Sequence, residues 1–216
     1  MSHPRTLVFV MFLLLPLATG CSFVRKTSDY FAGKTPAYYA RQMEDSSTPD
    51  NRWKGIDQLV ESDFAKHPPY TTRYRQIATT DADPLVRAVA VRALNRSRDA
   101  GATDVFITAL NDTSELVRLE GAKALVNLPD VNAVPGLLKL VNKLDEPRDV
   151  RLAAAEALKH YKQLDVARAL VSRLNERDFG VAWQARRSLR HMTQSDFAYN
   201  EASWLEYFTG PEKPFG

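Results

Sequence analysis

The sequence predicts an all-α protein, an α-solenoid of about five helical hairpins closed by a C-terminal capping helix. Two observations predict this fold. One helical pattern recurs at intervals of roughly 31–35 residues, and another apolar segment precedes each copy. The clearest copies are DPLVRAVAVRAL at 83–94, SELVRLEGAKAL at 114–125 and PRDVRLAAAEAL at 147–158. A unit this short cannot bury its own apolar face, so we expect the copies to stack.

The copies align on one position per repeat, and fixed positions after it share their chemistry. The aligned residues are Asn51, Val86, Val117, Val150 and Val181. Four positions later lie the small residues Gly55, Ala90, Gly121, Ala154 and Ala185, and eight positions later lie Leu59, Leu94, Leu125, Leu158 and Leu189. These positions share one helix face, which we predict to be buried. Small residues on that face let helices approach closely, and this accounts for glycines that otherwise cost about 1 kcal/mol in helix propensity.

The first helix of each hairpin is expected within 35–45, 68–80, 103–110, 133–144 and 165–174. Prolines and acidic residues near the helix starts support these assignments. The solenoid is therefore predicted to span residues 35–195, after a tether or N-terminal cap at 21–34. Residues 196–216 are predicted to form a C-terminal cap and tail. In this cap Asn200 begins a helix, and Trp204 and Phe208 cover the last apolar face.

The first 20 residues have the layout of a secretory signal peptide. Arg5 precedes an uncharged apolar run from Leu7 to Leu17, about half the roughly 20 residues that a membrane-spanning helix needs. Small residues follow, and then comes Cys21, the only cysteine of the chain, so no intramolecular disulfide is possible.

The sequence LATGC at 17–21 resembles a bacterial lipobox. The resemblance implies cleavage after residue 20 and a lipid on the Cys21 thiol, which places the protein at a membrane of the bacterial cell envelope. Ser22, where an aspartate would signal retention at the inner membrane, resembles the outer-membrane pattern. An ordinary signal peptide or an uncleaved anchor is the alternative interpretation.

The repeats resemble HEAT repeats of the short bacterial kind first named for phycobilin lyases. The resemblance runs from Thr35 to about His191 and is carried by LVRAVAVRAL, LVRLEGAKAL and DVRLAAAEAL. The outer repeats depart from the pattern, because Asn51 replaces the valine and Ala182 replaces the arginine. Terminal repeats commonly deviate in this way, since one side of each faces solvent.

An arginine follows the aligned position, and in three repeats an aspartate precedes that arginine by six residues. The pairs are Asp81 with Arg87, Asp112 with Arg118, and Asp145 with Arg151. One interpretation is a structural Asp–Arg ladder that ties the turns between helices together, as HEAT repeats are known for. The other is a basic strip for an anionic ligand. The coupling of acid to arginine favours the ladder.

A second set of residues is predicted to line the inner surface of the solenoid, at six, nine and ten positions after the aligned residue. This ridge comprises Arg92, Arg96, Lys123, Asn127, Lys159, His160, Arg187, Arg190 and His191. It is either a partner-binding surface or a solvated helix face. Trp183 is either an aromatic anchor for a partner or a residue packed between repeats.

No catalytic, cofactor-binding or metal-binding residue is predicted. The sequence has no phosphate-binding glycine loop and no Gly-x-Ser-x-Gly motif. Glu156, His160 and His191 suggest a metal site, but neighbouring helices lie about 8–10 Å apart and a closed site needs three or four ligands.

A formal charge of +3 is too small to indicate nucleic-acid binding, and no small-molecule substrate is identified. The leading hypothesis is a membrane-anchored, non-catalytic scaffold that binds a protein partner in the bacterial cell envelope. The first alternative is a protein that binds a polyanion or a cell-wall polymer through the basic ridge. The second is an enzyme of the HEAT-like lyase or hydroxylase type.

Overall fold

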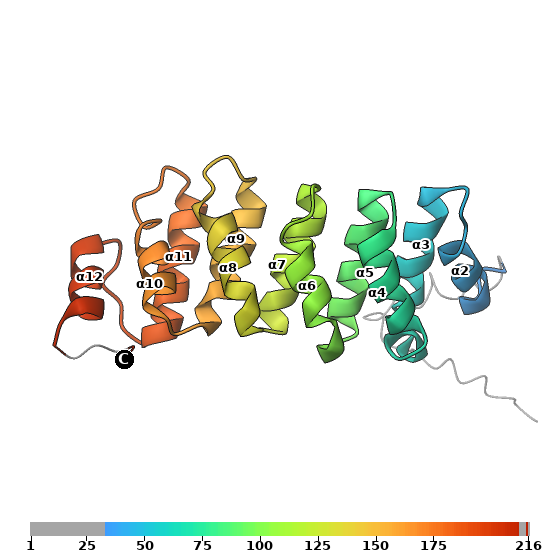
Figure 1. Cartoon of the computed structure of the whole chain (residues 1–216), viewed down its shortest axis with the longest axis horizontal. Helices are drawn as coiled ribbons and strands as arrows, with labels where there is room; N and C mark the ends of the chain where they lie inside the picture. Colours follow the sequence, from blue (N-terminus) through green and yellow to red (C-terminus); the bar gives the residue numbers. More distant parts are fainter. Residues whose placement is uncertain (1–32, 212–214, 216) are drawn as a thin grey trace, which may run out of the picture.

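The computed structural model describes residues 33–211 and 215, and within them the chain is helical with no strand. The helices form a row of five hairpins followed by one further helix, so the predicted α-solenoid is confirmed (Figure 1). The first helices of the hairpins are α2 (Pro36–Met43), α4 (Tyr70–Thr80), α6 (Thr103–Ala109), α8 (Val134–Asn142) and α10 (Leu164–Val171). The second helices are α3 (Pro49–Leu59), α5 (Pro84–Arg96), α7 (Glu115–Asn127), α9 (Arg148–Ala157) and α11 (Phe179–Thr193).

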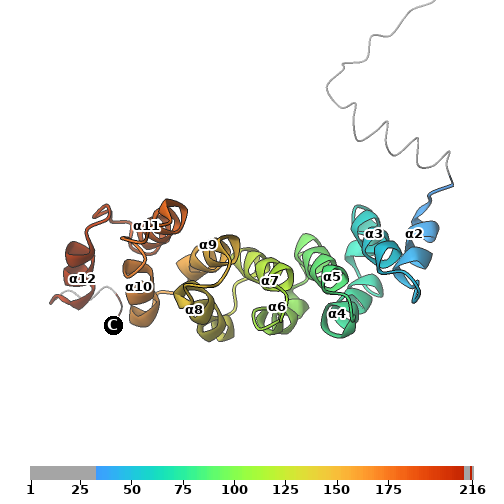
Figure 2. The same ribbon diagram turned by 90° about the horizontal axis from the view of Figure 1, so that it is seen from above.

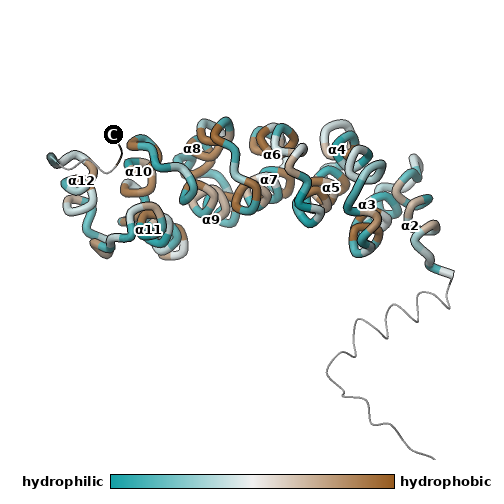
Figure 3. Tube along the Cα trace, turned by 90° about the horizontal axis from the view of Figure 1, so that it is seen from below, coloured by the Kyte–Doolittle hydropathy of each residue, from teal (hydrophilic) through white to brown (hydrophobic). Residues whose placement is uncertain are grey.

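The hairpins stack so that their helices form two layers. Figure 2 shows α3, α5, α7, α9 and α11 in one row, with α4, α6, α8 and α10 in the other. Successive second helices pack closely along the whole row, whereas successive first helices contact each other less. Hydrophobic and hydrophilic residues alternate along the helices from α5 to α11, as expected of helices with one buried face (Figure 3). The row of second helices is therefore the continuous part of the solenoid.

The core is built from the aligned positions of the repeats. Each of the five leucines is at most 1% exposed, and so are the four aligned valines. A methyl group at Gly55 would lie 2.5 Å from the backbone nitrogen of Met43, and one at Gly121 would lie 2.8 Å from Cβ of Ala109. The small position thus sets the close approach of the two helices within a hairpin.

Side chains at the helix starts satisfy the first backbone N–H groups. Thr35 accepts a hydrogen bond from the Tyr38 N–H, and Asp83 accepts bonds from Leu85 and Val86. At the other end, Asn200 accepts from the Ser203 N–H and begins α12 (Glu201–Thr209).

Helix α12 packs on α10, where a sixth repeat would place its first helix. It buries Trp204 and Phe208, whose rings stack with their centroids 6.0 Å apart. The residues of the predicted cap therefore cover the end of the first-helix row.

The predicted signal peptide, the lipid-bearing Cys21 and most of the predicted tether lie outside the described residues. Within the described part of the chain, no helix is long and apolar enough to cross a membrane.

Replacing Leu125 with Ala should lower the free energy of unfolding by about 2–5 kcal/mol, because it opens a cavity under a fully buried side chain. Leu116→Ala is the matched control on the same helix, since Leu116 is 43% exposed and its replacement should change stability by about 0.5 kcal/mol or less. Urea unfolding followed by circular dichroism measures both variants. Equal losses of stability would show that the assignment of the buried face is wrong.

Candidate interaction surface

Arginine–carboxylate ion pairs connect each hairpin to the next one. Arg52 Nε lies 2.8 Å from Asp81 Oδ2. At the corresponding position of the next three repeats, Arg87 pairs with Asp112, Arg118 with Glu146, and Arg151 with Glu176. In every pair the arginine comes from one second helix and the acid from the turn of the following repeat. The ladder therefore joins repeats.

The pairing differs from the one that the sequence spacing predicted. The ion pair expected between Asp81 and Arg87, six residues apart, is replaced by a main-chain contact, since Arg87 Nη1 donates to the Asp81 carbonyl at 2.9 Å. The same main-chain contact, at 2.8 Å, takes the place of the expected pair between Arg118 and Asp112. Because each of these arginines follows its aspartate by six residues, its guanidinium lies over the turn of its own repeat. The remaining guanidinium nitrogens reach the carboxylate of the next repeat.

Asp145 was predicted to form one of the ion pairs of the ladder, and it does not. Its side chain is 82% exposed and lies 3.8 Å from Lys143. The neighbouring Glu146, with a side chain 1% exposed, accepts from Arg118 Nε at 2.6 Å instead. Arg151, predicted to pair with Asp145, binds Glu176 of the following repeat. The longer glutamate side chain reaches inward from a turn position that leaves the aspartate in solvent.

The ladder aspartates also shape the turns that precede the second helices. Asp81 Oδ1 accepts from the Asp83 N–H at 2.9 Å, and Asp112 Oδ1 accepts from the Ser114 N–H at 2.8 Å. Burial raises the pKa of Asp81, but the Arg52 guanidinium and the Asp83 N–H outweigh it and hold the pKa below its usual value. The pKa of Asp112 is lowered in the same way against burial, by Arg87 and the Ser114 N–H.

Most cations of the predicted ridge are paired with acids. Arg92 and Lys123 both contact Glu120, at 3.0 and 3.5 Å. The remaining pairs are Arg96 with Glu61 at 2.7 Å and Asp57 at 3.5 Å, Lys159 with Glu156 at 3.3 Å, and Arg190 with Asp196 at 3.3 Å. The face therefore carries both signs of charge, because an acid lies beside each of these cations.

The other ridge residues link neighbouring second helices. Asn127 Nδ2 donates to Asn95 Oδ1 at 3.0 Å, and His160 Nε2 lies 2.9 Å from the Val126 carbonyl oxygen. The His160 and His191 rings are 6.0 Å apart between centroids. Burial lowers the pKa of His160, and the neighbouring Lys159 and His191 contribute to this despite the opposing bond to Val126. These side chains therefore serve contacts between repeats.

Trp183 lies at the open end of the second-helix row. It is 46% exposed, whereas Ala88, at the equivalent position of α5, is 1% exposed. The guanidinium of Arg187, the remaining ridge residue, lies 5.3 Å from the Trp183 ring centroid. Because α12 packs on α10, α11 is not covered by a further second helix within the described residues. The interpretation of Trp183 as a residue packed between repeats is therefore wrong.

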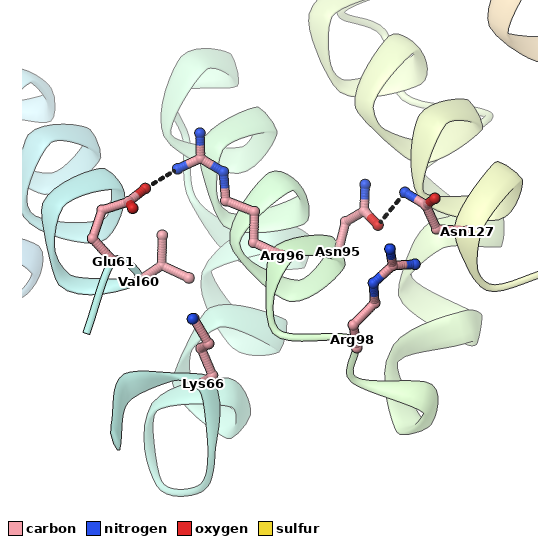
Figure 4. Close-up of a pocket in the computed structure, with 7 residues that line it drawn as sticks. All are labelled: Val60, Glu61, Lys66, Asn95, Arg96, Arg98 and Asn127. Carbon is pink, nitrogen blue, oxygen red and sulfur yellow. Dashed lines mark hydrogen bonds and ion pairs between the residues drawn. The ribbon is translucent and has the colours of Figure 1, made fainter. Parts of the chain in front are cut away.

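An open groove of about 490 Å³ lies at the C-terminal ends of α3, α5 and α7 (Figure 4). It is lined by Val60, Glu61, Lys66, Asn95, Arg96, Arg98 and Asn127. Lys66 and Arg98 were not predicted from the sequence, because both lie outside the aligned helices. Lys66 belongs to a short 3-10 helix, Asp63–Lys66, and Arg98 to the turn after α5.

The metal site suggested by Glu156, His160 and His191 is not assembled. Residues 33–211 and 215 contain no group of three or more His, Cys, Asp or Glu side chains that could hold a metal ion. Glu156 instead contacts Lys159, and His160 contacts a backbone carbonyl.

Replacing Glu146 with Gln should lower the free energy of unfolding by about 3 kcal/mol, because it leaves the largely buried charge of Arg118 without its counterion. Asp145→Asn removes a charge from the adjacent, exposed position and should change stability by about 0.5 kcal/mol or less. Thermal and urea unfolding of both variants measure the difference. A larger loss of stability in Asp145→Asn than in Glu146→Gln would instead support the pairing predicted from the sequence.

The free energy of unfolding should fall as pH drops below about 4, the unfolded-state pKa of aspartate. The pKa values of Asp81 and Asp112 are lower in the folded than in the unfolded state. The two carboxylates therefore stabilise the fold fully above about pH 4. This stabilisation is lost as the pH falls from there through their folded-state pKa values. A variant with both residues changed to Asn should be less stable at neutral pH and should lose less stability in acid. An acid-induced loss as large as that of the unmodified protein would refute this assignment.

Comparisons with known proteins agree with this architecture. Residues 72–147 match a family model described as HEAT repeats. Comparison with curated protein sequences gives no match. Among solved structures, a crystal structure of an engineered protein is similar, with a TM-score of 0.57 and 22% identity over 72% of this chain and 79% of that one.

Human deoxyhypusine hydroxylase in complex with glycerol is also similar, with a TM-score of 0.51 and 21% identity over 74% of this chain. The match spans 64% of the hydroxylase chain. Both likenesses show the fold alone. Residues 72–147 therefore match HEAT repeats and lie within an α-solenoid that continues on both sides of them.

Proposed function

We propose that the protein is a lipid-anchored, non-catalytic scaffold that binds a protein partner in the bacterial cell envelope. The observation that carries the proposal is the continuous row of second helices, whose exposed face runs from α3 to α11. Solenoids use such extended surfaces to bind partners. A face that carries both signs of charge is suited to a protein surface, because electrostatic complementarity selects a partner.

Rigidity of the row supports the same function. Arg52, Arg87 and Arg118 each bond to the turn of their own repeat and to the carboxylate of the next, so they fix one hairpin relative to the other. The contacts of Asn127 and His160 add further links. A surface that is already ordered before binding loses less conformational entropy when a partner docks.

The proposed anchor sets how far the scaffold reaches. From Cys21 to Thr35, the N-terminal cap of α2, the chain spans at most about 50 Å when fully extended. A lipid of two or three acyl chains on Cys21 would hold the domain near the membrane more firmly than a single chain does. Ser22 favours the outer membrane as the location.

The other two hypotheses receive less support. A polyanion or cell-wall polymer needs a run of available cations, and most ridge cations are paired with Glu120, Glu61, Glu156 or Asp196. The human hydroxylase is similar in fold alone, and the histidines at the suggested metal position contact each other and a backbone carbonyl.

The test is site-specific photo-crosslinking in the native host, with a crosslinking residue in place of exposed Lys123 on α7. The matched control replaces Lys139, exposed on α8 in the opposite layer. We expect one or two dominant protein adducts from position 123 that are absent from position 139. Those adducts should disappear when Cys21→Ser removes the lipid attachment site. The same diffuse adducts from both positions, or none, would contradict the scaffold proposal.

A further inference from the structure

Arg98 occupies a backbone position that usually belongs to glycine. Its φ of 52° is in the left-handed region. The Asp99 N–H donates to the Leu94 carbonyl at 3.2 Å, and the Arg98 N–H donates to the Asn95 carbonyl at 3.1 Å. This is the hydrogen-bond pattern of a Schellman motif ending α5, in which the left-handed residue is most often glycine because a Cβ is disfavoured there. The arginine is therefore not explained by local backbone preference.

The Arg98 side chain has no hydrogen-bond or ion-pair partner among the residues that the structure describes. It extends from the turn after α5 toward Asn127 and lines the groove shown in Figure 4. Among the described residues, no hydrogen bond or ion pair involves its guanidinium, in contrast to Arg96 beside it, which contacts Glu61 at 2.7 Å. Departure from a local rule without a compensating contact is typical of functional positions.

The groove around Arg98 has a positive balance of charge. Lys66 projects into it from the connection between α3 and α4 (Figure 4). The ion pair of Lys66 with Asp63, at 2.9 Å, is weak, because the Asp63 side chain is 97% exposed. Among the described residues that line the groove, Glu61 is the only carboxylate, against the three cations of Lys66, Arg96 and Arg98.

Two amide side chains complete the groove and narrow the class of ligand. Asn95 and Asn127 share one hydrogen bond and retain further donor and acceptor capacity, which matches the N–H and C=O groups of a peptide. Glu61 disfavours a uniformly anionic polymer. The ridge cations Arg92 and Lys123 on the same face share Glu120 as a counterion, so they are less available to a ligand than Arg98.

We propose that this groove binds acidic side chains of an extended segment of the partner protein, with Arg98 as the principal contact. The proposal rests on the scaffold function and specifies the chemistry of the partner. Arg98 supplies a planar guanidinium suited to bidentate contact with a carboxylate, and Lys66 adds a second positive charge beside it. The asparagines orient the backbone of the bound segment.

The experiment measures binding of a fluorescent peptide of alternating Glu and Ser to the purified full chain in detergent, by anisotropy. A peptide with Gln in place of Glu is the ligand control. We expect the acidic peptide to bind the unmodified protein and the Gln peptide not to bind. Arg98→Gly should weaken binding by about tenfold or more. The same variant should unfold at an unchanged or higher temperature, because glycine suits the left-handed position.

A matched variant separates the groove from general charge effects. Arg98→Glu and Arg177→Glu change the net charge equally, and Arg177 is exposed on the turn before α11, outside the groove. Only Arg98→Glu should abolish binding. Equal binding of both peptides, or undiminished binding by Arg98→Gly, would overturn the proposal.

Vesicles containing phosphatidylglycerol distinguish another class of ligand. Binding to these vesicles that is lost in Arg98→Glu, with no peptide binding, would overturn the peptide assignment and show a phosphate site. In each of these failures, a dominant adduct at position 123 in cells would leave the scaffold function standing.

Discussion

The packing of one second helix against the next is the constraint on which the rest of the structure depends. Each hairpin is too short to enclose its own core, so stability and shape come from contacts between repeats. Apolar residues at the aligned positions supply the burial, and the small residue, as at Gly55 and Gly121, sets the distance between the two helices of a hairpin. The arginine ladder then fixes the orientation of successive hairpins, because guanidiniums such as that of Arg87 bond to two repeats at once.

Charges that hold repeats together are not available to a ligand, and this separates structural from functional residues. Arg92, Lys123 and Lys159 are paired with acids on the same face. Arg98 lies on the same side of the solenoid, and within residues 33–211 and 215 its guanidinium has no ion pair or hydrogen bond. Trp183 is exposed because no second helix follows α11 in the described part of the chain. The places where the repeat pattern stops, at a turn or at an end, are therefore where the surface offers groups to a partner.

The sequence predicted the solenoid and its buried leucines because a periodic pattern reports which helix face is covered. It did not predict the partners in the ladder. Asp112 lies six residues before Arg118 in the chain but bonds to Arg87 of the preceding repeat, and spacing along one repeat carries no information about contacts between two. Asp145 was predicted in the ladder instead of the adjacent Glu146. The length of the side chain decides which of two adjacent acids reaches an arginine, and the sequence pattern does not show this. Lys66 and Arg98 lie in connections without periodicity, so only the three-dimensional arrangement brings them to one groove.

A double-mutant cycle on Arg87 and Asp112 tests most directly the claim that the ladder couples neighbouring repeats. The free energy of unfolding is measured for the unmodified protein, Arg87→Ala, Asp112→Ala and the double variant. The side chains are 14% and 16% exposed and their nearest atoms are 2.8 Å apart, so we expect a coupling of about 1–3 kcal/mol. A coupling near zero would show that apolar packing alone joins the repeats and would contradict the structural role given to the ladder.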